Sequence, residues 1–525
     1  MLISPRALVR LLLATGIVLA SFAMAQSTLT IGRATDITNM NPFRQANNAT
    51  SEVTYTVHEG LVTFTPDLEL VPQLATSWEL LDDGVTWRFF LREGVNFHSG
   101  NPFNAEVVKW NFETMMNPDD PGVAAGLLAA FREVEVVDEY TIDVTLHDPN
   151  VVFVATLGAP LLMMVDMLHY EEVGETAYSQ QSPSGTGPFR FVSWSPGQRV
   201  VLEANEGYWG DVGPEVDRVV FEVIPEESSR VLALRTGEVD MIFGVPAEQM
   251  DALDAMSGLQ VWRTPTLRTV FLEMVTQHPF LTRDVRHAIA HAVDRDQISA
   301  IIGDNGSPAY SHGPPGTLGF FDHTFPYDVE RAAELLEGEG WTLGNDGFRT
   351  KDGQRLSVSN LARGVTPGEI EALQVLQLQL RAVGVEMTIE RVDAAAWTGT
   401  MNDGAVAWAE NRTVPSHSMW TSAAGIRTGE VGYLMNRPKC EQTIRNWTMI
   451  ECTPEYDEAF ARSQMPLDLD ERQTAYEVLG QYTMEWQARV PLFHVQSNIA
   501  AKDSVEGFVV NPQDALDLRG VSLGN

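Results

Sequence analysis

Cysteine and lysine are scarce in this chain of 525 residues. The two cysteines, Cys440 and Cys452, have no CxxC or HxxxH pattern near them, and a metal site needs more ligands than these two supply. Lysine and arginine together number 35 against 71 acidic residues, which leaves a formal net charge of −36. A field of that sign repels nucleic acid and anionic lipid, so we expect neither as a partner.

Long apolar runs are absent beyond residue 25. A membrane span needs roughly 20 consecutive apolar residues, so we expect no direct membrane insertion and a chain that folds in water. Its length exceeds what a single hydrophobic core supports, which predicts two or three domains.

The one apolar run, residues 11–22, follows Arg6 and Arg10 and ends in Ala23-Met24-Ala25. This order is typical of a secretory signal peptide, which predicts that residues 1–25 are removed on export. An uncleaved anchor helix is the alternative, but the run is short for a span. No cysteine lies directly after this apolar run, so we expect a periplasmic protein without a lipid anchor.

Export places Cys440 and Cys452 in an oxidising compartment, where a nearby pair usually closes a disulfide. We therefore predict a Cys440–Cys452 bond, worth roughly 3 kcal/mol for its short loop in the chain-entropy model. Two buried free thiols are the alternative.

Signatures of catalysis are missing. The chain has no G-x-S-x-G elbow, no P-loop and no H-E-x-x-H motif. Gly185-Thr186-Gly187 resembles a phosphate loop, but Pro188 removes a backbone N–H that a phosphate cradle needs. We expect no enzymatic activity and no cofactor. His417 is the histidine that we consider as a candidate metal ligand, although a lone histidine more commonly forms hydrogen bonds.

Strand and helix patterns alternate along the chain, which predicts an α/β fold. The hairpin-rich stretch 60–180 reads as a subdomain. Two strand–helix–strand units follow, one before and one after about residue 265. The predicted elements of these units are strands at 219–224, 239–243 and 385–389 and helices at 226–236, 284–302 and 369–383.

Several motifs resemble, in order, the peptide/nickel class of solute-binding proteins that serve ABC importers. They lie at residues 72–79, 83–89, 91–106, 185–189, 205–209, 237–240, 283–288, 292–295 and 490–493.

The resemblance implies a two-lobed protein whose cleft closes on its ligand, with two hinge crossovers. Lobe I would comprise residues 26–58, 182–263 and 486–525, with 59–181 as its appended subdomain, and lobe II residues 264–485. A ligand that contacts both walls stabilises the closed form. The implied partners are a small-molecule solute and the ABC permease/ATPase complex, and we expect a monomer.

Arg363 lies where dipeptide-binding relatives place an arginine that pairs with the ligand carboxylate. A guanidinium suits that task because it binds a carboxylate bidentately. A surface arginine without a ligand is the alternative interpretation.

Residues 407–416 are predicted to be a loop, and they resemble the stretch in which peptide binders place an aspartate before proline. Val414 occupies that position here, and Asn411 and Ser416 replace the other two acids, while Arg412 adds a positive charge. An α-ammonium without a counter-charge is poorly held in a dry cleft. Glu410 is the one substitute nearby.

Three tryptophans, Trp397, Trp408 and Trp420, flank this stretch and are candidate stacking walls, although each also suits a core. Asn39 and Asn41, which follow the first strand, are candidate polar contacts from lobe I.

The leading hypothesis is therefore a receptor for a small acidic solute that is not an ordinary peptide. A di- or oligopeptide receptor is the first alternative, followed by metal-chelate capture through His417. A secreted hydrolase and a sensory role are the remaining rivals.

Overall fold

The computed structural model describes residues 26–45, 48–123, 125–128, 130–320, 324–426, 428–435, 448, 453–511 and 516–524. The predicted signal peptide and the predicted Cys440–Cys452 bond both lie outside the described residues. No helix in the described part is long and apolar enough to cross a membrane.

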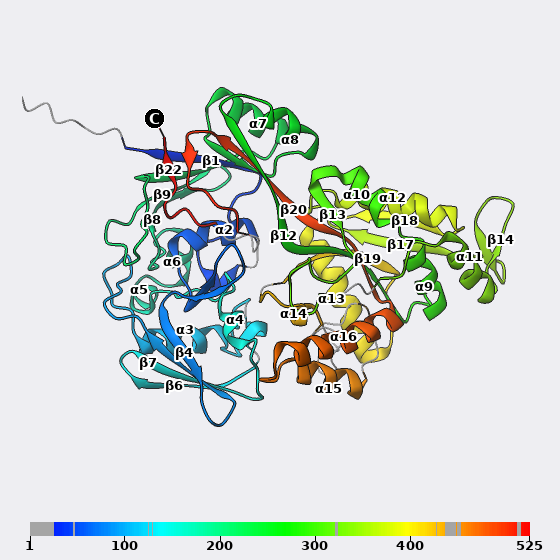
Figure 1. Ribbon diagram of the computed structural model, residues 1–525, viewed down its shortest axis with the longest axis horizontal. Coiled ribbons are helices and arrows are strands. Elements are labelled where there is room, and N and C mark those ends of the chain that lie inside the picture. Colours follow the sequence, from blue (N-terminus) through cyan, green and yellow to red (C-terminus); the bar gives the residue numbers. More distant parts are fainter. Residues whose placement is uncertain are drawn as a thin grey trace, which may run out of the picture.

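The molecule has two lobes, and one sheet continues through both (Figure 1). Its strand order is β18-β17-β19-β12-β20-β11-β1-β10-β9-β8, with β13 paired to β20. The two longest strands, β12 (Leu259–Met274) and β20 (Arg489–Lys502), are antiparallel and run from one lobe into the other. These strands are the two crossovers that the sequence predicted.

Lobe I packs its core on the strands that follow β20 in that order, and it contains the first and last described strands of the chain. The central strand β1 is parallel to β10 and β11. Its elements are β1 (Thr28–Arg33), η1 (Pro42–Arg44), α2 (Asn48–Val57), β8 (Phe189–Ser195), β9 (Arg199–Ala204), β10 (Arg218–Val223), α7 (Glu227–Thr236), β11 (Met241–Phe243), α8 (Ala247–Asp254), β21 (Val505–Glu506) and β22 (Ser522–Leu523).

A four-stranded antiparallel sheet, β4-β5-β7-β6, forms the subdomain with its own aromatic-rich core. Its elements are β2 (Val62–Phe64), β3 (Leu70–Pro72), β4 (Ala75–Leu80), β5 (Thr86–Leu91), α3 (Ala105–Met115), η2 (Ala125–Leu128), β6 (Phe131–Asp138), β7 (Thr141–Leu146), α4 (Phe153–Leu157), α5 (Met167–Val173) and α6 (Glu175–Gln180). The buried Glu59 joins this core to lobe I, because it accepts hydrogen bonds from Tyr208 Oη, Trp209 Nε1 and Thr186 Oγ1.

Lobe II packs helices on both faces of its sheet, with separate apolar clusters on each. Its elements are α9 (Arg283–His291), α10 (Arg295–Ile302), η3 (Gly303–Asn305), β13 (Gly306–Pro308), α11 (Val329–Gly338), β14 (Thr342–Leu343), β15 (Arg349–Lys351), β16 (Gln354–Arg355), β17 (Ser357–Ala362), α12 (Glu369–Ala382), β18 (Glu386–Arg391), α13 (Ala394–Asn411), β19 (Met419–Gly425), α14 (Gly432–Met435), α15 (Pro454–Ser463) and α16 (Leu469–Trp486).

Two expectations about helices are corrected. The helix predicted at 284–302 is two helices, because Asp294 caps α10: its side chain accepts from the N–H of Gln297. The loop predicted at 407–416 begins only at Arg412, because α13 continues to Asn411. Arg412 ends the helix in a left-handed conformation, with φ of 59°.

The register of the long strands places the carboxyl ends of both sets of parallel strands opposite each other. β11 runs along β20 toward lobe II and ends at Phe243, opposite Ile499. β19 runs along β12 toward lobe I and ends at Gly425, opposite Arg268. β1 and β17 are parallel to β11 and β19 respectively, so their ends face the same middle region. Ligands of open α/β sheets bind outside such carboxyl ends.

Candidate functional site

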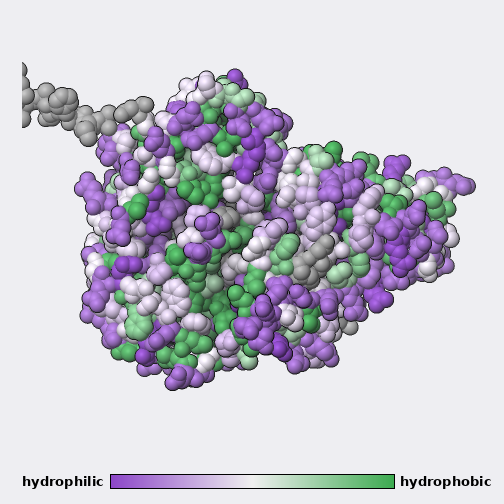
Figure 2. All heavy atoms as spheres, viewed as in Figure 1, coloured by the Kyte–Doolittle hydropathy of each residue, from purple (hydrophilic) through white to green (hydrophobic). Residues whose placement is uncertain are grey.

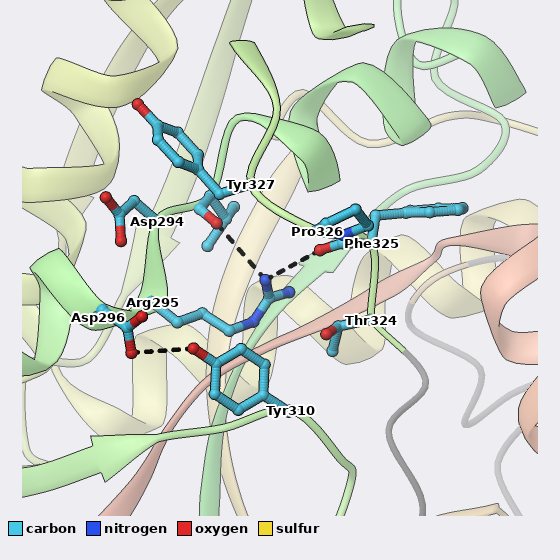
Figure 3. A pocket seen from close by; sticks show the side chains of 9 residues that line it. Asp294, Arg295, Asp296, Tyr310, Thr324, Phe325, Pro326 and Tyr327 are labelled. Atoms are coloured by element: carbon cyan, nitrogen blue, oxygen red, sulfur yellow. Dashed lines mark hydrogen bonds between the residues drawn. The ribbon is translucent and has the colours of Figure 1, made fainter.

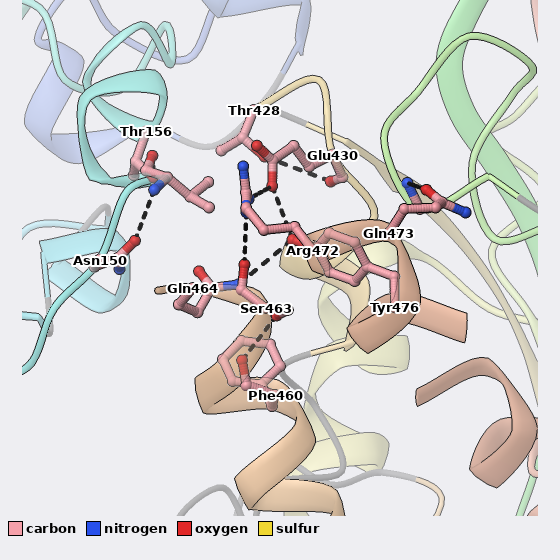
Figure 4. Close-up of polar contacts among 12 residues, drawn as sticks. Asn150, Thr156, Thr428, Glu430, Phe460, Ser463, Gln464, Arg472, Gln473 and Tyr476 are labelled. Atoms are coloured by element: carbon pink, nitrogen blue, oxygen red, sulfur yellow. Dashed lines mark hydrogen bonds and ion pairs between the residues drawn. The ribbon is translucent and has the colours of Figure 1, made fainter. Parts of the chain in front are cut away.

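The two lobes touch below that middle region (Figure 4). The backbone N–H of Val151 in the subdomain donates to the carbonyl of Gln464, at the end of α15, at 3.0 Å. Leu68 of the subdomain packs against the lobe II cluster that contains Phe271 and Tyr476. Hydrophobic side chains gather in a band near the middle of the face that Figure 2 shows, between more polar outer parts. The lobes are therefore in contact at these residues.

The helices α15 and α16, which form this contact, are held together by a partly buried carboxylate. Glu430 accepts from Arg472 and from Tyr476 Oη, the latter at 2.8 Å. Arg472 also donates to the carbonyl of Ser463 at 2.8 Å, next to Gln464 (Figure 4). This network ties α15 and α16 to the segment that follows β19.

Arg363 directly follows β17, at the edge of the lobe II sheet that faces lobe I. Its guanidinium carbon lies 4.6 Å from the centre of the Trp397 ring, near the start of α13. Stacking of this kind holds a guanidinium in place while its edge stays free to bind a planar anion.

No described residue forms an ion pair with Arg363, and its Nε is buried without a hydrogen-bond partner in the described part of the chain. Buried arginines elsewhere have partners of two kinds. Arg33 pairs with Glu52 at 2.7 Å and Arg489 with Glu273 at 2.8 Å, whereas Arg230 and Arg286 have no ion pair among the described residues and donate to backbone carbonyls. Arg363 has neither kind of partner in the described part of the chain, and a half-buried guanidinium without a partner is costly. This points to an anion supplied from outside.

Two charged residues act on Arg363. Burial lowers the pKa of Arg363, the charge of Glu369 opposes that change, and the positive charge of Arg268 adds to it. Glu369 is buried at the start of α12, with its Oε1 unpaired among the described residues. Arg268 is half-buried on β12. The three side chains carry a net positive charge at the carboxyl end of β17.

Glycine shapes the turn that carries Arg363. Gly364 adopts φ of 62°, and a side chain there would meet Arg391 Nε at 2.6 Å. Arg391 Nη2 donates to the Gly364 carbonyl at 3.1 Å. The close approach of β17 and β18 therefore requires glycine immediately after the arginine.

Trp397 and Trp420 are almost fully buried, with 3% and 2% exposure, and share a cluster with Leu361. Trp408 and Val414 are partly buried against the same cluster. Trp397 contributes to the site through its face toward Arg363, whereas Trp420 packs in the core at the start of β19.

The residues at the far end of α13 do not join Arg363. Arg412 stacks on Trp408, with 4.9 Å between the guanidinium carbon and the ring centre. Trp408 lies eleven residues after Trp397, about 16 Å along the helix. α13 starts after the end of β18, so its last turn, which precedes Arg412, lies away from the end that carries Trp397 and Arg363.

Other polar side chains of that segment are also placed. Asn411 is exposed, and its Oδ1 accepts from the N–H and hydroxyl of Thr413. Glu410 and Ser416 are exposed. His417 Nε2 lies 3.0 Å from Glu390 Oε2. No group of three potential metal ligands occurs among the described histidine, cysteine and acidic residues.

Asn39 and Asn41 maintain the loop after β1. Asn41 is fully buried and its Oδ1 caps η1 by accepting from the N–H of Phe43 at 3.0 Å. Asn39 accepts from the N–H of Asn41 and donates to the carbonyl of Arg44. Both amides therefore serve the loop itself.

A separate hollow of about 350 Å³ lies on lobe II, beside α10 (Figure 3). Arg295 projects into its wall, but its Nε donates to the carbonyl of Pro491 at 2.9 Å. Tyr310 Oη donates to Asp296 Oδ1 at 2.9 Å. Both hydrogen bonds lie within lobe II. Arg363 does not line this hollow.

Sequence reasoning missed Arg268. Arg268 lies in the long strand β12, and from the sequence alone an arginine in such a strand is interpreted as a solvent-exposed residue. Its position becomes meaningful only with the strand register, because it lies opposite the end of β19. It lies within one of the two register shifts of β12 against β20, between Pro265 and Thr269.

The family model of bacterial extracellular solute-binding proteins, family 5, middle region, matches residues 69–426. The chain belongs to this family. Its members bind small solutes or peptides and deliver them to ABC permease/ATPase complexes, so the family predicted from the motifs is confirmed.

Two curated relatives are glutathione-binding proteins by name. The glutathione-binding protein GsiB of Pectobacterium atrosepticum is 28% identical over 467 residues, covering 88% of each chain. The protein of the same name from Escherichia coli is 24% identical over 519 residues, covering 98% of each.

Solved structures share the fold. NikA from Brucella suis, in complex with Fe(III)-EDTA, has a TM-score of 0.83 at 23% identity and covers 94% of this chain and 99% of its own. DppA from Helicobacter pylori, in complex with the peptide STSA, has a TM-score of 0.79 at 24% identity, with 95% and 99% coverage. The two-lobed fold predicted from the sequence is confirmed.

Proposed function

We propose that this family 5 receptor captures a small anionic solute between its lobes in the periplasm, after removal of residues 1–25, and releases it unchanged to an ABC importer. Arg363 binds an acidic group of the solute. The observation that carries this proposal is the half-buried guanidinium of Arg363, which has no ion pair among the described residues of a strongly acidic chain.

Glutathione is the first solute to test. The curated relatives carry that ligand in their name, and glutathione is a γ-linked tripeptide with two carboxylates. It therefore agrees with an acidic solute that differs from an ordinary peptide.

A di- or oligopeptide is the second candidate, and Glu369 favours it. This carboxylate is buried at the same strand edge, and its Oε1 has no partner in the described part of the chain. A carboxylate beside a guanidinium suits a zwitterion, with the ammonium on Glu369 and the carboxylate on Arg363.

Mass spectrometry of the solute that co-purifies with the protein, followed by calorimetry with glutathione and the dipeptide Met-Leu, tests the proposal. An acidic solute is expected. Binding of neutral sugars with no affinity for either acid would contradict it. Incubation of the bound solute with the protein should leave its mass unchanged, and a new product would show enzymatic chemistry.

A further inference from the structure

Arg263 on the crossover strand β12 binds carboxylates of both lobes. Its Nη2 donates to Asp251 Oδ1 at 2.7 Å and its Nη1 to Asp254 Oδ2 at 3.2 Å, both on α8 of lobe I. Its Nε donates to Asp304 Oδ2 at 2.8 Å, in η3 of lobe II. The hydrogen bond to Asp304 is the largest of the causes that raise the pKa of Arg263. One guanidinium therefore joins a helical segment of each lobe.

The residue opposite Arg263 on the other crossover strand holds the same two regions. Asn498 of β20 pairs with Arg263 in the strand register and is buried. Its Nδ2 donates to the Asp304 carbonyl at 3.0 Å. Its own carbonyl accepts from the N–H of Val245, just before α8, at 3.1 Å. Both crossovers are therefore tied to lobe I and to η3 at the same point.

The segments that Arg263 joins also pack against each other. A Cβ atom at Gly303, the first residue of η3, would lie 3.8 Å from the Cβ of Ala247, the first residue of α8. In the view of Figure 1, α8 lies above the β12–β20 ribbon. The contact between Val151 and Gln464 belongs to the segments beside α4 and α15, which lie below it. The lobes thus meet on both sides of the ribbon in this view.

Hinge bending moves one lobe relative to the other about such crossovers. Hydrogen bonds of 2.7 to 3.2 Å, as Arg263 forms, weaken steeply when distance or angle changes. The side chains of Arg263 and Asp304 are 28% and 34% exposed, so their ion pair is weak and screened by salt. A weak pair suits a hinge that has to open, because it biases the two arrangements without locking either.

We propose that Arg263 and Asp304 form a hinge clamp that stabilises the arrangement with the lobes in contact, and that this clamp weakens as the salt concentration rises. Separation of Val151 from Gln464 turns η3 relative to α8 and breaks the bond between Arg263 and Asp304. The clamp goes beyond the proposed function, because it acts on the ligand-free protein and involves no solute.

Hydrogen exchange of the ligand-free protein tests the clamp. The N–H of Val151 donates to the Gln464 carbonyl across the lobes and exchanges when they separate. Asp304→Asn removes the lobe II carboxylate and should speed exchange in peptides covering Val151 by about two- to fivefold at low salt, and Arg263→Gln should do the same. In about 0.5 M salt the difference from wild type should shrink, because the pair is already screened.

Asp251→Asn is the matched control, because it removes the same charge from the same guanidinium but within lobe I. It should leave exchange at Val151 unchanged, and the amides of β7 should exchange alike in all variants. Thermal unfolding confirms that each variant folds. Exchange at Val151 that is equal to or slower than wild type in Asp304→Asn would overturn the inference. An equal acceleration in Asp251→Asn would also overturn it, since net charge would then explain the effect. The proposed function stands in either case, because no solute is present.

Discussion

The guanidinium of Arg363 lies over the ring of Trp397, 4.6 Å from its centre, at the end of a strand that faces the other lobe. The matching pair, Arg412 on Trp408, lies three helical turns away along α13. The two pairs have the same local chemistry, but only the first is at the carboxyl edge of the sheet. Position in the topology, rather than residue type, distinguishes them.

Leu68 is expected to stabilise the closed arrangement of the lobes. It adopts φ of 64°, which costs roughly 1 kcal/mol for a residue with a side chain, and packs against the lobe II cluster. Leu68→Ser removes the apolar contact and should increase the radius of gyration of the ligand-free protein in X-ray scattering. Its affinity for solute should fall severalfold, because closure becomes less favourable. Asp67→Asn, on the same turn, is the control, and scattering identical to wild type in Leu68→Ser would refute the prediction.

Stability should depend on pH through His58. Burial, with a smaller contribution from His98, lowers the pKa of the His58 imidazole to about 3. Tyr178 donates its hydroxyl to the Ser184 carbonyl, and the two ring nitrogens of His58 lie 3.0 Å from Tyr178 Oη (Nε2) and 3.4 Å from the Thr54 carbonyl (Nδ1).

The unfolded chain binds a proton at His58 near pH 6.5 and the folded chain does not. The stabilisation is therefore complete above pH 6.5 and is lost as pH falls toward 3. Between pH 7 and 4.5 the wild type should lose about 2 to 3 kcal/mol more free energy of unfolding than His58→Gln. Urea unfolding at both pH values measures this, and equal losses would exclude the mechanism.

The ion pair between Glu273 and Arg489 should contribute strongly to lobe II. Glu273 Oε1 accepts from Arg489 Nε at 3.0 Å, from Nη2 at 2.8 Å and from Ser422 Oγ at 2.6 Å, with both partners buried. Glu273→Gln leaves the arginine charge buried without compensation and should cost about 3 to 5 kcal/mol. Glu390→Gln, which removes the exposed contact with His417, should cost less than about 1 kcal/mol. Similar losses in the two variants would contradict this account.

Periodicity predicted most of the framework, because strands such as β5 and helices such as α12 bury one face each. It did not predict the break between α9 and α10, where the apolar spacing continues and only the cap at Asp294 interrupts the helix. Arg363 was predicted from the family resemblance by its distance from Gly384, and its role stays a prediction. The position of Arg268 was not predicted, because it depends on the strand register with β19, about 150 residues away, which is invisible in a local pattern. The domain limits drawn from the sequence stay a prediction.

The stretch 407–416 illustrates the same limit. Its polar residues and tryptophans suggested a ligand loop, but most of the stretch up to Asn411 is helical, and the last turn of α13 lies away from the end that carries Trp397 and Arg363. The direction of the crossover, which follows from the pairing of β17 with β18 and β19, determines where those side chains lie.

The most direct test of the central claim is calorimetric titration of glutathione into wild type, Arg363→Gln and Arg412→Gln. The account predicts that Arg363→Gln weakens binding by about 1.5 to 3 kcal/mol, roughly 10- to 150-fold, while Arg412→Gln stays within about twofold of wild type. Unchanged affinity in Arg363→Gln, or an equal loss in both variants, would contradict an anion site at the end of β17.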